Sequence, residues 1–331
     1  MSDYPVGIYL GPNDSSIAVW KNGKAEILLN DNGSKDSAGR TTPSVVSFTK
    51  NERLVGEAAK DQITKNPKNT IYGIREIIGQ KFDEPEVQKF IKKVPFKIEK
   101  DSKTNKPKII VEYLGKITSF YPEEIYAMII QKLISSAREY IRSEINEAII
   151  TVPSYYNDSQ RQAIIDSGKI CGLNKVKIVN EDIAVCYAYN LDLYENEKNI
   201  LVFNMRSNET NVTILHLNNS NFEVKATIRD DNLGGNLFDE ELIKYCINEF
   251  KEETGIMIQK NNSKAYRRLK IACEKGKFEL SYSLETTIDL DNLVKGEDLY
   301  IKIDKADFKH MCRNLFDKII PLIEKALNDS K

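Results

Sequence analysis

The sequence has little of what would indicate an extracellular, metal-binding or membrane-spanning protein. Its 331 residues include five cysteines and two histidines, with no CxxC pair and no run of about 18 uncharged apolar residues. The odd number and wide spacing of the cysteines favour buried, reduced thiols over a disulfide framework or a zinc site. The first residues lack a basic region followed by an apolar run, so we expect no signal peptide. These absences predict a cytoplasmic protein with no metal site and no membrane span.

The charge is also balanced. Forty-eight lysines and arginines stand against 49 acidic residues, which leaves a formal net charge of −1. No overall field therefore attracts nucleic acid or an anionic membrane, and neither is an expected partner. The length is sufficient for two domain-sized lobes, because single cores stop growing at about 250–300 residues.

Apolar spacing predicts alternating strands and helices. Residues 6–10, 15–20 and 24–29 read as three short strands at the N-terminus, and 148–153 as a buried strand. A similar succession follows residue 210, so the plan is α/β with two related lobes. Helices are predicted at 56–65, 70–78, 122–145, 158–171 with Asp158 as its cap, 238–253, 263–281 and, as one continuous helix, from an Asp304 cap to the C-terminal region.

Several longer stretches then become recognisable. They resemble signature stretches of the seventy-kilodalton heat-shock chaperones (the Hsp70 or DnaK-type family) and occur in family order from about Val6 to Lys331. The resemblance implies the nucleotide-binding (ATPase) domain of that family. Its actin-like ATPase fold has two lobes around a nucleotide cleft, here 1–180 for lobe I and 181–331 for lobe II. The resemblance ends at Lys331, before the third family signature, and we expect no peptide-binding domain. The matching stretches are Arg40–Ser44, Pro67–Thr70, Phe120–Glu124, Thr151–Ala163, Asn180–Glu181, Leu233–Gly235 and Arg267–Glu274.

The first phosphate loop of the family reads Asp-Leu-Gly-Thr-Thr, and this chain departs from it. Tyr9 replaces a magnesium-associated carboxylate and adds bulk, while Gly11 is kept. Pro12 removes a backbone donor. Asp14 adds a negative charge where the resemblance places a triphosphate. At an effective dielectric constant of about 20, a carboxylate about 4 Å from a phosphate charge costs about 4 kcal/mol.

The second phosphate loop of the family reads Phe-Asp-Leu-Gly-Gly-Gly-Thr, and here the changes are larger. Asn204 replaces the acid, none of the three glycines remains, and Glu209 stands where the family has a small hydroxyl. The catalytic lysine of the family corresponds to Arg75, which keeps the charge but not the compact ammonium geometry. If Arg75 and Arg206 turn inward, they offset part of the added negative charge.

Other positions match the family and are candidates for nucleotide binding. Glu181 is retained, although Asp182 follows it in place of a proline, and Phe278 replaces an arginine that packs on the base. The candidate nucleotide-binding residues are Gly11, Ser15, Gly234, Gly235, Glu274, Lys277 and Ser281.

Three functions are compatible with this pattern. The loop chemistry favours a pseudo-ATPase that needs no cofactor and binds a protein partner, such as a J-domain protein, an exchange factor, another chaperone or a larger assembly. The first alternative is a divergent ATPase of the chaperone cycle that still binds ATP or ADP with magnesium. The second is an actin-like structural or assembly subunit in which nucleotide stabilises the fold.

Overall fold

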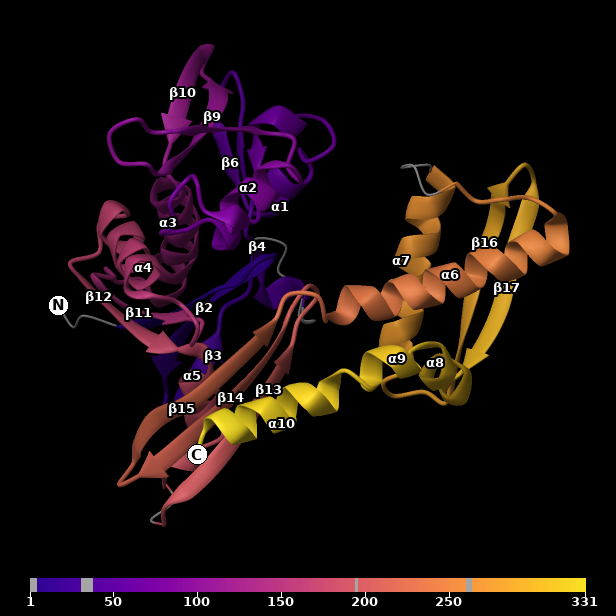
Figure 1. Ribbon diagram of the computed structural model, residues 1–331. Coiled ribbons are helices and arrows are strands. Elements are labelled where there is room, and N and C mark those ends of the chain that lie inside the picture. Colours follow the sequence, from indigo (N-terminus) through magenta and orange to yellow (C-terminus); the bar gives the residue numbers. More distant parts are fainter. Residues whose placement is uncertain (1–4, 31–37, 194–195, 260–263) are drawn as a thin grey trace. The chain divides into compact units, whose positions relative to one another are not determined.

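The computed structural model describes residues 5–30, 38–193, 196–259 and 264–331. It divides into two compact units, Met1–Tyr189 and Asn190–Lys331 (Figure 1). The lobe boundary predicted from the sequence lies earlier, after residue 180. The difference arises because helix α5 (Glu181–Ala188) packs on strands β11 and β12 and therefore belongs to the first unit.

The main sheet of the first unit has the strand order β12-β11-β1-β2-β3, with β4 paired to β2. Strand β11, predicted from the sequence as a buried strand over 148–153, lies between β1 and β12 and is parallel to both, so Thr151 and Val152 lie within the sheet and not at its edge. Alternate residues of β1 point into the core. The strands are β1 (Val6–Leu10), β2 (Asp14–Lys21), β3 (Lys24–Ile27), β4 (Thr42–Pro43), β11 (Glu147–Val152) and β12 (Lys175–Asn180).

Two helices, α3 (Pro122–Ile141) and α4 (Asp158–Ile170), pack against each other and contact strands of this sheet (Figure 1). Pro122 occupies the first helical position of α3, where its missing N–H is no loss. The cap of α4 is Asn157 rather than the predicted Asp158, because the Asn157 side chain accepts the hydrogen bond from the Gln160 N–H.

The rest of the first unit consists of two small sheets, β6-β5-β7 and β10-β9-β8, with short helices. The predicted helix over 70–78 is wrong, because Gly73 has a left-handed backbone at φ 69° and separates a short strand from a single 3-10 turn. The helix predicted over 56–65 is limited to four residues. The elements are β5 (Val46–Phe48), β6 (Arg53–Val55), α1 (Glu57–Lys60), β7 (Thr70–Ile71), η3 (Ile74–Glu76), α2 (Pro85–Ile91), β8 (Lys97–Lys100), β9 (Pro107–Tyr113) and β10 (Lys116–Phe120).

The second unit has a three-stranded sheet, β13-β14-β15, and a two-stranded sheet, β16-β17. Helix α10 packs on β14 and β15, whereas α6 packs on α7 and α7 on β16. The elements are β13 (Lys198–Met205), β14 (Thr210–Asn218), β15 (Asn221–Asp230), α6 (Gly235–Thr254), α7 (Lys264–Glu279), β16 (Glu285–Val294), β17 (Glu297–Asp304), α8 (Lys305–Met311), α9 (Arg313–Phe316) and α10 (Ile319–Asp329).

The single C-terminal helix predicted from Asp304 is instead three helices. Asp304 does cap the first, with its side chain accepting from the Asp307 N–H. The chain then breaks at Cys312 and Lys318. Pro321 has no N–H and is tolerated only in the first turn of a helix, which is where α10 places it.

All five cysteines are free thiols, and four of them are buried. None of the helices within the described ranges combines the length and apolar character that a membrane span requires.

Candidate functional site

In the loop between β1 and β2, the Tyr9 ring lies directly beside Gly11. A Cβ atom added at Gly11 would lie 2.7 Å from Tyr9 Cε1 and 2.9 Å from Tyr9 Oη, and it would overlap the Asp14 carbonyl oxygen. Real Cβ atoms do not approach other atoms this closely, so only glycine fits at this position. Gly11 is therefore required by the Tyr9 ring at the end of β1 and the Asp14 backbone at the start of β2.

The same loop is anchored from the side by two serines. The Ser44 Oγ atom donates a 3.0 Å hydrogen bond to the Gly11 carbonyl oxygen and lies 2.8 Å from Ser15 Oγ. The Ser44 N–H donates to the Asn13 carbonyl oxygen at 2.8 Å. Both serines are buried. Ser15 is a candidate nucleotide-binding residue from the sequence. In the structure its hydroxyl is hydrogen-bonded to Ser44 within the protein.

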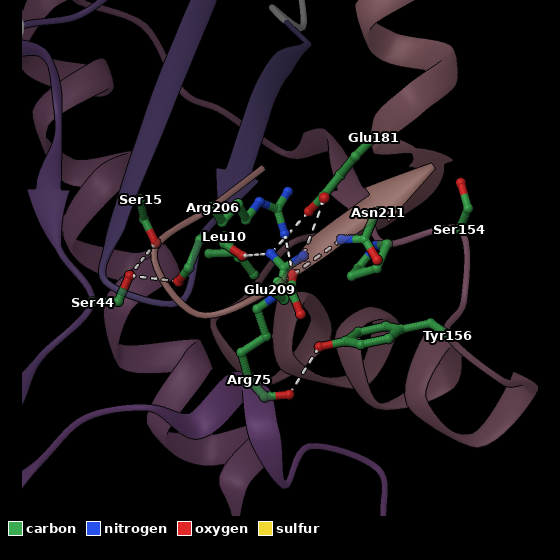
Figure 2. Close-up of polar contacts among 12 residues, drawn as sticks. Leu10, Ser15, Ser44, Arg75, Ser154, Tyr156, Glu181, Arg206, Glu209 and Asn211 are labelled. Atoms are coloured by element: carbon green, nitrogen blue, oxygen red, sulfur yellow. Dashed lines mark hydrogen bonds and ion pairs between the residues drawn. The ribbon is translucent and has the colours of Figure 1, made fainter. Parts of the chain in front are cut away.

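Arg75 and Glu181 form a buried ion pair in the first unit (Figure 2). Arg75 Nη1 donates to Glu181 Oε1 at 2.9 Å and to the Leu10 carbonyl oxygen at 3.0 Å, while Nη2 donates to Glu181 Oε2 at 3.1 Å. The Tyr156 hydroxyl donates to the Arg75 carbonyl oxygen at 3.2 Å. Arg75, predicted to stand in place of the family's catalytic lysine, and Glu181 therefore bind each other, and Arg75 also binds the first loop.

The environment of Arg75 explains why its charge persists. Burial opposes the charged form, but the neighbouring Glu181 carboxylate outweighs it, so the pKa of Arg75 is raised well above its ordinary value. Such a bidentate pair is among the stronger hydrogen-bonded contacts in proteins. Breaking a buried pair by removing one partner typically costs about 3–5 kcal/mol, because the other charge is left uncompensated.

In the second unit, the segment that the sequence predicts as the second phosphate loop is a tight turn between β13 and β14. The Arg206 N–H donates to the Glu209 carbonyl oxygen at 2.8 Å, which closes the turn over Ser207 and Asn208. Asn204 lies opposite Asn211 in the ladder between these strands. Met205 packs into a small apolar cluster with Leu233 and its neighbours. The loss of three glycines is accommodated because this turn needs none of them.

The Glu209 carboxylate is held by two arginines, Arg206, which Figure 2 shows beside it, and Arg229. Its Oε1 atom lies 3.0 Å from Arg206 Nη1 and accepts from Asn211 Nδ2 at 3.3 Å, and its Oε2 atom lies 3.0 Å from Arg229 Nη2. The sequence predicts an inward turn of the Arg206 side chain but not the contact of Arg229 with Glu209. Strand pairing could have revealed it, because Arg229 on β15 faces Asn211 on β14, two residues from Glu209.

The N-terminus of α6 is covered by the same turn. A Cβ at Gly234 would lie 2.6–2.8 Å from backbone atoms of Ser207, Asn208 and Glu209. The N–H of Gly235 donates to the Arg206 carbonyl oxygen at 2.7 Å, and the N–H of Asn236 to the Ser207 carbonyl oxygen at 2.8 Å. Free N–H groups at a helix N-terminus are a common anion site. These two are already hydrogen-bonded to the loop.

The remaining candidates lie along α7. Lys277 contacts the buried Asp239 carboxylate at 2.7 Å and donates to the Gly235 carbonyl oxygen at 3.1 Å. Glu274 is exposed on α7, and Ser281 is exposed just beyond its end. Phe278, which replaces an arginine of the family, is also exposed. Within the ranges described, no group of three or more histidine, cysteine or acidic side chains is arranged to hold a metal ion.

Comparison with known proteins identifies the family. The model of the Hsp70 protein family matches residues 5–331. A heat shock 70 kDa protein of Neurospora crassa is 43% identical over 327 residues, which is 98% of this chain and 49% of that protein. The heat shock cognate 70 kDa protein 3 of Dictyostelium discoideum is 40% identical over 329 residues, 98% of this chain and 51% of that protein. The chain thus spans about half the length of these relatives. It belongs to the Hsp70 family, whose nucleotide-binding domain has the actin-like ATPase fold that the sequence motifs predict.

Proposed function

We propose that this chain is a pseudo-ATPase of the Hsp70 family, a chaperone module that binds protein partners and does not hydrolyse ATP. The observation that carries the proposal is the pairing of Arg75 with Glu181 and with the Leu10 carbonyl oxygen. For Arg75 to approach a phosphate, it would have to leave a buried carboxylate. That costs about 3–5 kcal/mol, or about a hundred- to several-thousand-fold in affinity.

Two further observations support the proposal. The Tyr9 ring lies against Gly11, where the family's carboxylate and compact loop would meet the magnesium and phosphates. In the second unit, the first N–H groups of α6 donate hydrogen bonds to the turn between β13 and β14. The anion that pairs with Arg206 and Arg229 is the Glu209 carboxylate of the protein itself. These residues do not fit a magnesium–nucleotide complex. Phosphoryl transfer depends almost wholly on positioning and electrostatics, so the loss of these groups leaves little catalysis.

The family relationship favours one alternative. The chain is about 40–43% identical to Hsp70 relatives and retains Glu274, Lys277 and Ser281. A divergent ATPase that binds ATP or ADP with magnesium would use these residues for the adenosine. Lys277 would first have to leave Asp239.

A single-turnover assay separates the two functions. The whole chain is mixed in excess with labelled ATP and magnesium, and phosphate release is compared with that of a family member whose loops retain the Asp and Gly residues. We expect a rate at the uncatalysed background, unchanged when magnesium is chelated. A rate comparable to that of the intact relative and abolished by chelation would contradict the pseudo-ATPase and support the alternative. As protein partners of the module we propose the classes that the family predicts: a J-domain protein, an exchange factor, another chaperone or a larger assembly.

A further inference from the structure

The main sheet of the first unit is packed closely on one of its two faces. Helix α4 lies on that side, because a Cβ atom added at its Gly168 would lie 2.6 Å from Val176 Cγ2 on β12. Strands β12, β11 and β1 run parallel to one another. Sheets of parallel strands are almost always covered on both faces, so the state of the second face needs an explanation. The buried residues of β1 and β11 on the packed face are Val6, Ile8, Ala148 and Ile150.

The second face carries one row of residues that crosses five strands. The register aligns them in the order Lys177, Ile149, Gly7, Ala18 and Ile27. Ile149 is 42% exposed, although β11 lies within the sheet, and Ile27 is 49% exposed. Large apolar side chains therefore stand in water on this face, where a polar residue would be expected if the face were meant to stay solvated.

The centre of this row forms a trough, with Gly7 and Ala18 as its floor and Ile149 and Ile27 as its walls. A Cβ atom added at Gly7 would meet no atom within 4 Å among the residues that the structure describes. The walls are three strand spacings apart, which is about 14 Å. An α-helix with its side chains is about 10–12 Å across. The trough therefore has the width of a single helix.

The size of the apolar surface also favours one helix over a second copy of this chain. Trp20, on the same face of β2 and two residues from Ala18, is 65% exposed and extends the apolar surface along the trough. The large apolar side chains of this surface are thus Trp20, Ile27 and Ile149. A standard interface between two proteins uses about 20–30 residues a side, which is far more than this surface offers.

The β12 side of the trough is positively charged. Lys177 ends the row beyond Ile149 and is exposed. Lys175, two residues earlier on β12, contacts the Glu147 carboxylate at 2.9 Å. A carboxylate on a docked helix would face Lys177, and an exposed pair of this kind contributes about two- to fivefold in affinity.

We infer that the trough over Gly7 and Ala18, between Ile149 and Ile27, docks an amphipathic helix of a partner protein that carries an acidic residue opposite Lys177. The apolar side of the helix covers the second face of the parallel strands, and the carboxylate fixes its orientation across them. The inference deepens the proposed function by naming the chemistry of the partner, and it rests on that function for the premise that the chain acts by binding proteins.

The test uses the whole chain and a probe helix of about 18 residues that contains no tryptophan. The acidic probe has leucines at helical spacing and glutamates along one border of the leucine side, and a matched basic probe has lysines in place of the glutamates. Binding is followed by the emission of Trp20, the single tryptophan. We expect the acidic probe to shift this emission to shorter wavelength with a Kd of about 10–100 μM, and the basic probe to bind about two- to fivefold more weakly.

Variants then locate the binding through the anisotropy of a fluorescein-labelled acidic probe. Gly7→Phe fills the trough and is expected to weaken binding at least about tenfold without lowering the melting temperature, because aromatic residues suit strands and the new Cβ atom has room. Ile149→Ser removes one wall and should weaken binding at least about threefold. Lys177→Glu should reverse the preference between the two probes. The matched control Ile117→Ser removes an exposed isoleucine from β10 and leaves the Kd unchanged.

The inference is overturned if about 1 mM acidic probe leaves the Trp20 emission unchanged, or if Gly7→Phe binds the probe as tightly as the native chain. It is also overturned if the native chain sediments as a dimer and Gly7→Phe as a monomer, because the occupant would then be a second copy. Its failure is separable from that of the proposed function. A chain that neither binds the probe nor hydrolyses ATP has lost only the docking site, whereas one that binds the probe and hydrolyses ATP has lost only the pseudo-ATPase.

Discussion

Both oxygens of the Glu181 carboxylate accept hydrogen bonds from the two terminal nitrogens of Arg75, at 2.9 and 3.1 Å, although the residues are 106 positions apart. Both side chains are nearly inaccessible to water. The pair connects the start of α5 to the end of β1 through the additional bond to the Leu10 carbonyl oxygen. The charge of Arg75 therefore has a structural partner within the protein.

The first prediction follows from that pair. Arg75→Met is expected to lower the free energy of unfolding by about 3–5 kcal/mol, because Glu181 is then buried without a counter-charge. The double variant Arg75→Met with Glu181→Leu should recover much of the loss, since no charge remains buried. Urea unfolding followed by the fluorescence of Trp20, the single tryptophan, measures the first unit. A single variant as stable as the native chain would show that the pair contributes nothing.

Two adjacent glycines provide a matched comparison in the second unit. Gly234→Ala should destabilise the protein by about 1–3 kcal/mol, because its Cβ would overlap the backbone of Ser207 and Asn208. Gly235→Ala meets nothing closer than the Lys277 Nζ atom at 3.5 Å and should be neutral or stabilising by less than about 1 kcal/mol. Chemical denaturation followed by circular dichroism distinguishes them. Equal effects at the two positions would mean that the second loop does not lie on the α6 N-terminus.

A third prediction concerns the anion within the second loop. Glu209→Gln removes the charge that Arg206 and Arg229 share and is expected to cost about 1–3 kcal/mol. Inorganic phosphate should then raise the melting temperature of the variant more than that of the native chain, because it can replace the lost carboxylate between the arginines. Sodium chloride at the same ionic strength is the control. The prediction fails if phosphate and chloride have equal effects on the variant.

Regular elements could be predicted from local patterns. Strand β1, strand β11 and helix α4 begin and end within one or two residues of the predicted positions, since periodicity and capping are encoded by neighbours in sequence. The region 70–78 could not, because a single left-handed glycine, Gly73, overrides the apolar spacing. Likewise, the C-terminal stripe is continuous in sequence, whereas the helix that carries it breaks at Cys312 and Lys318.

The candidate site was only partly predictable. The substitutions at Tyr9, Asn204 and Arg75 are visible in the sequence, but what the new side chains contact is not. The Arg75–Glu181 contact joins residues far apart in the chain, and no spacing rule encodes it. The contact of Arg229 with Glu209 follows from strand register and becomes visible only once β14 and β15 are paired.

Direct titration of the whole chain with magnesium–ADP by isothermal calorimetry tests the central claim, that the groups which would bind the phosphates are bonded to one another. We expect no saturable heat up to about 1 mM nucleotide, the range in which binding free energies fall to about −4 kcal/mol. A dissociation constant below about 10 μM that is lost when magnesium is chelated would contradict the account, because the Arg75–Glu181 pair and the second loop would then have to open at little cost.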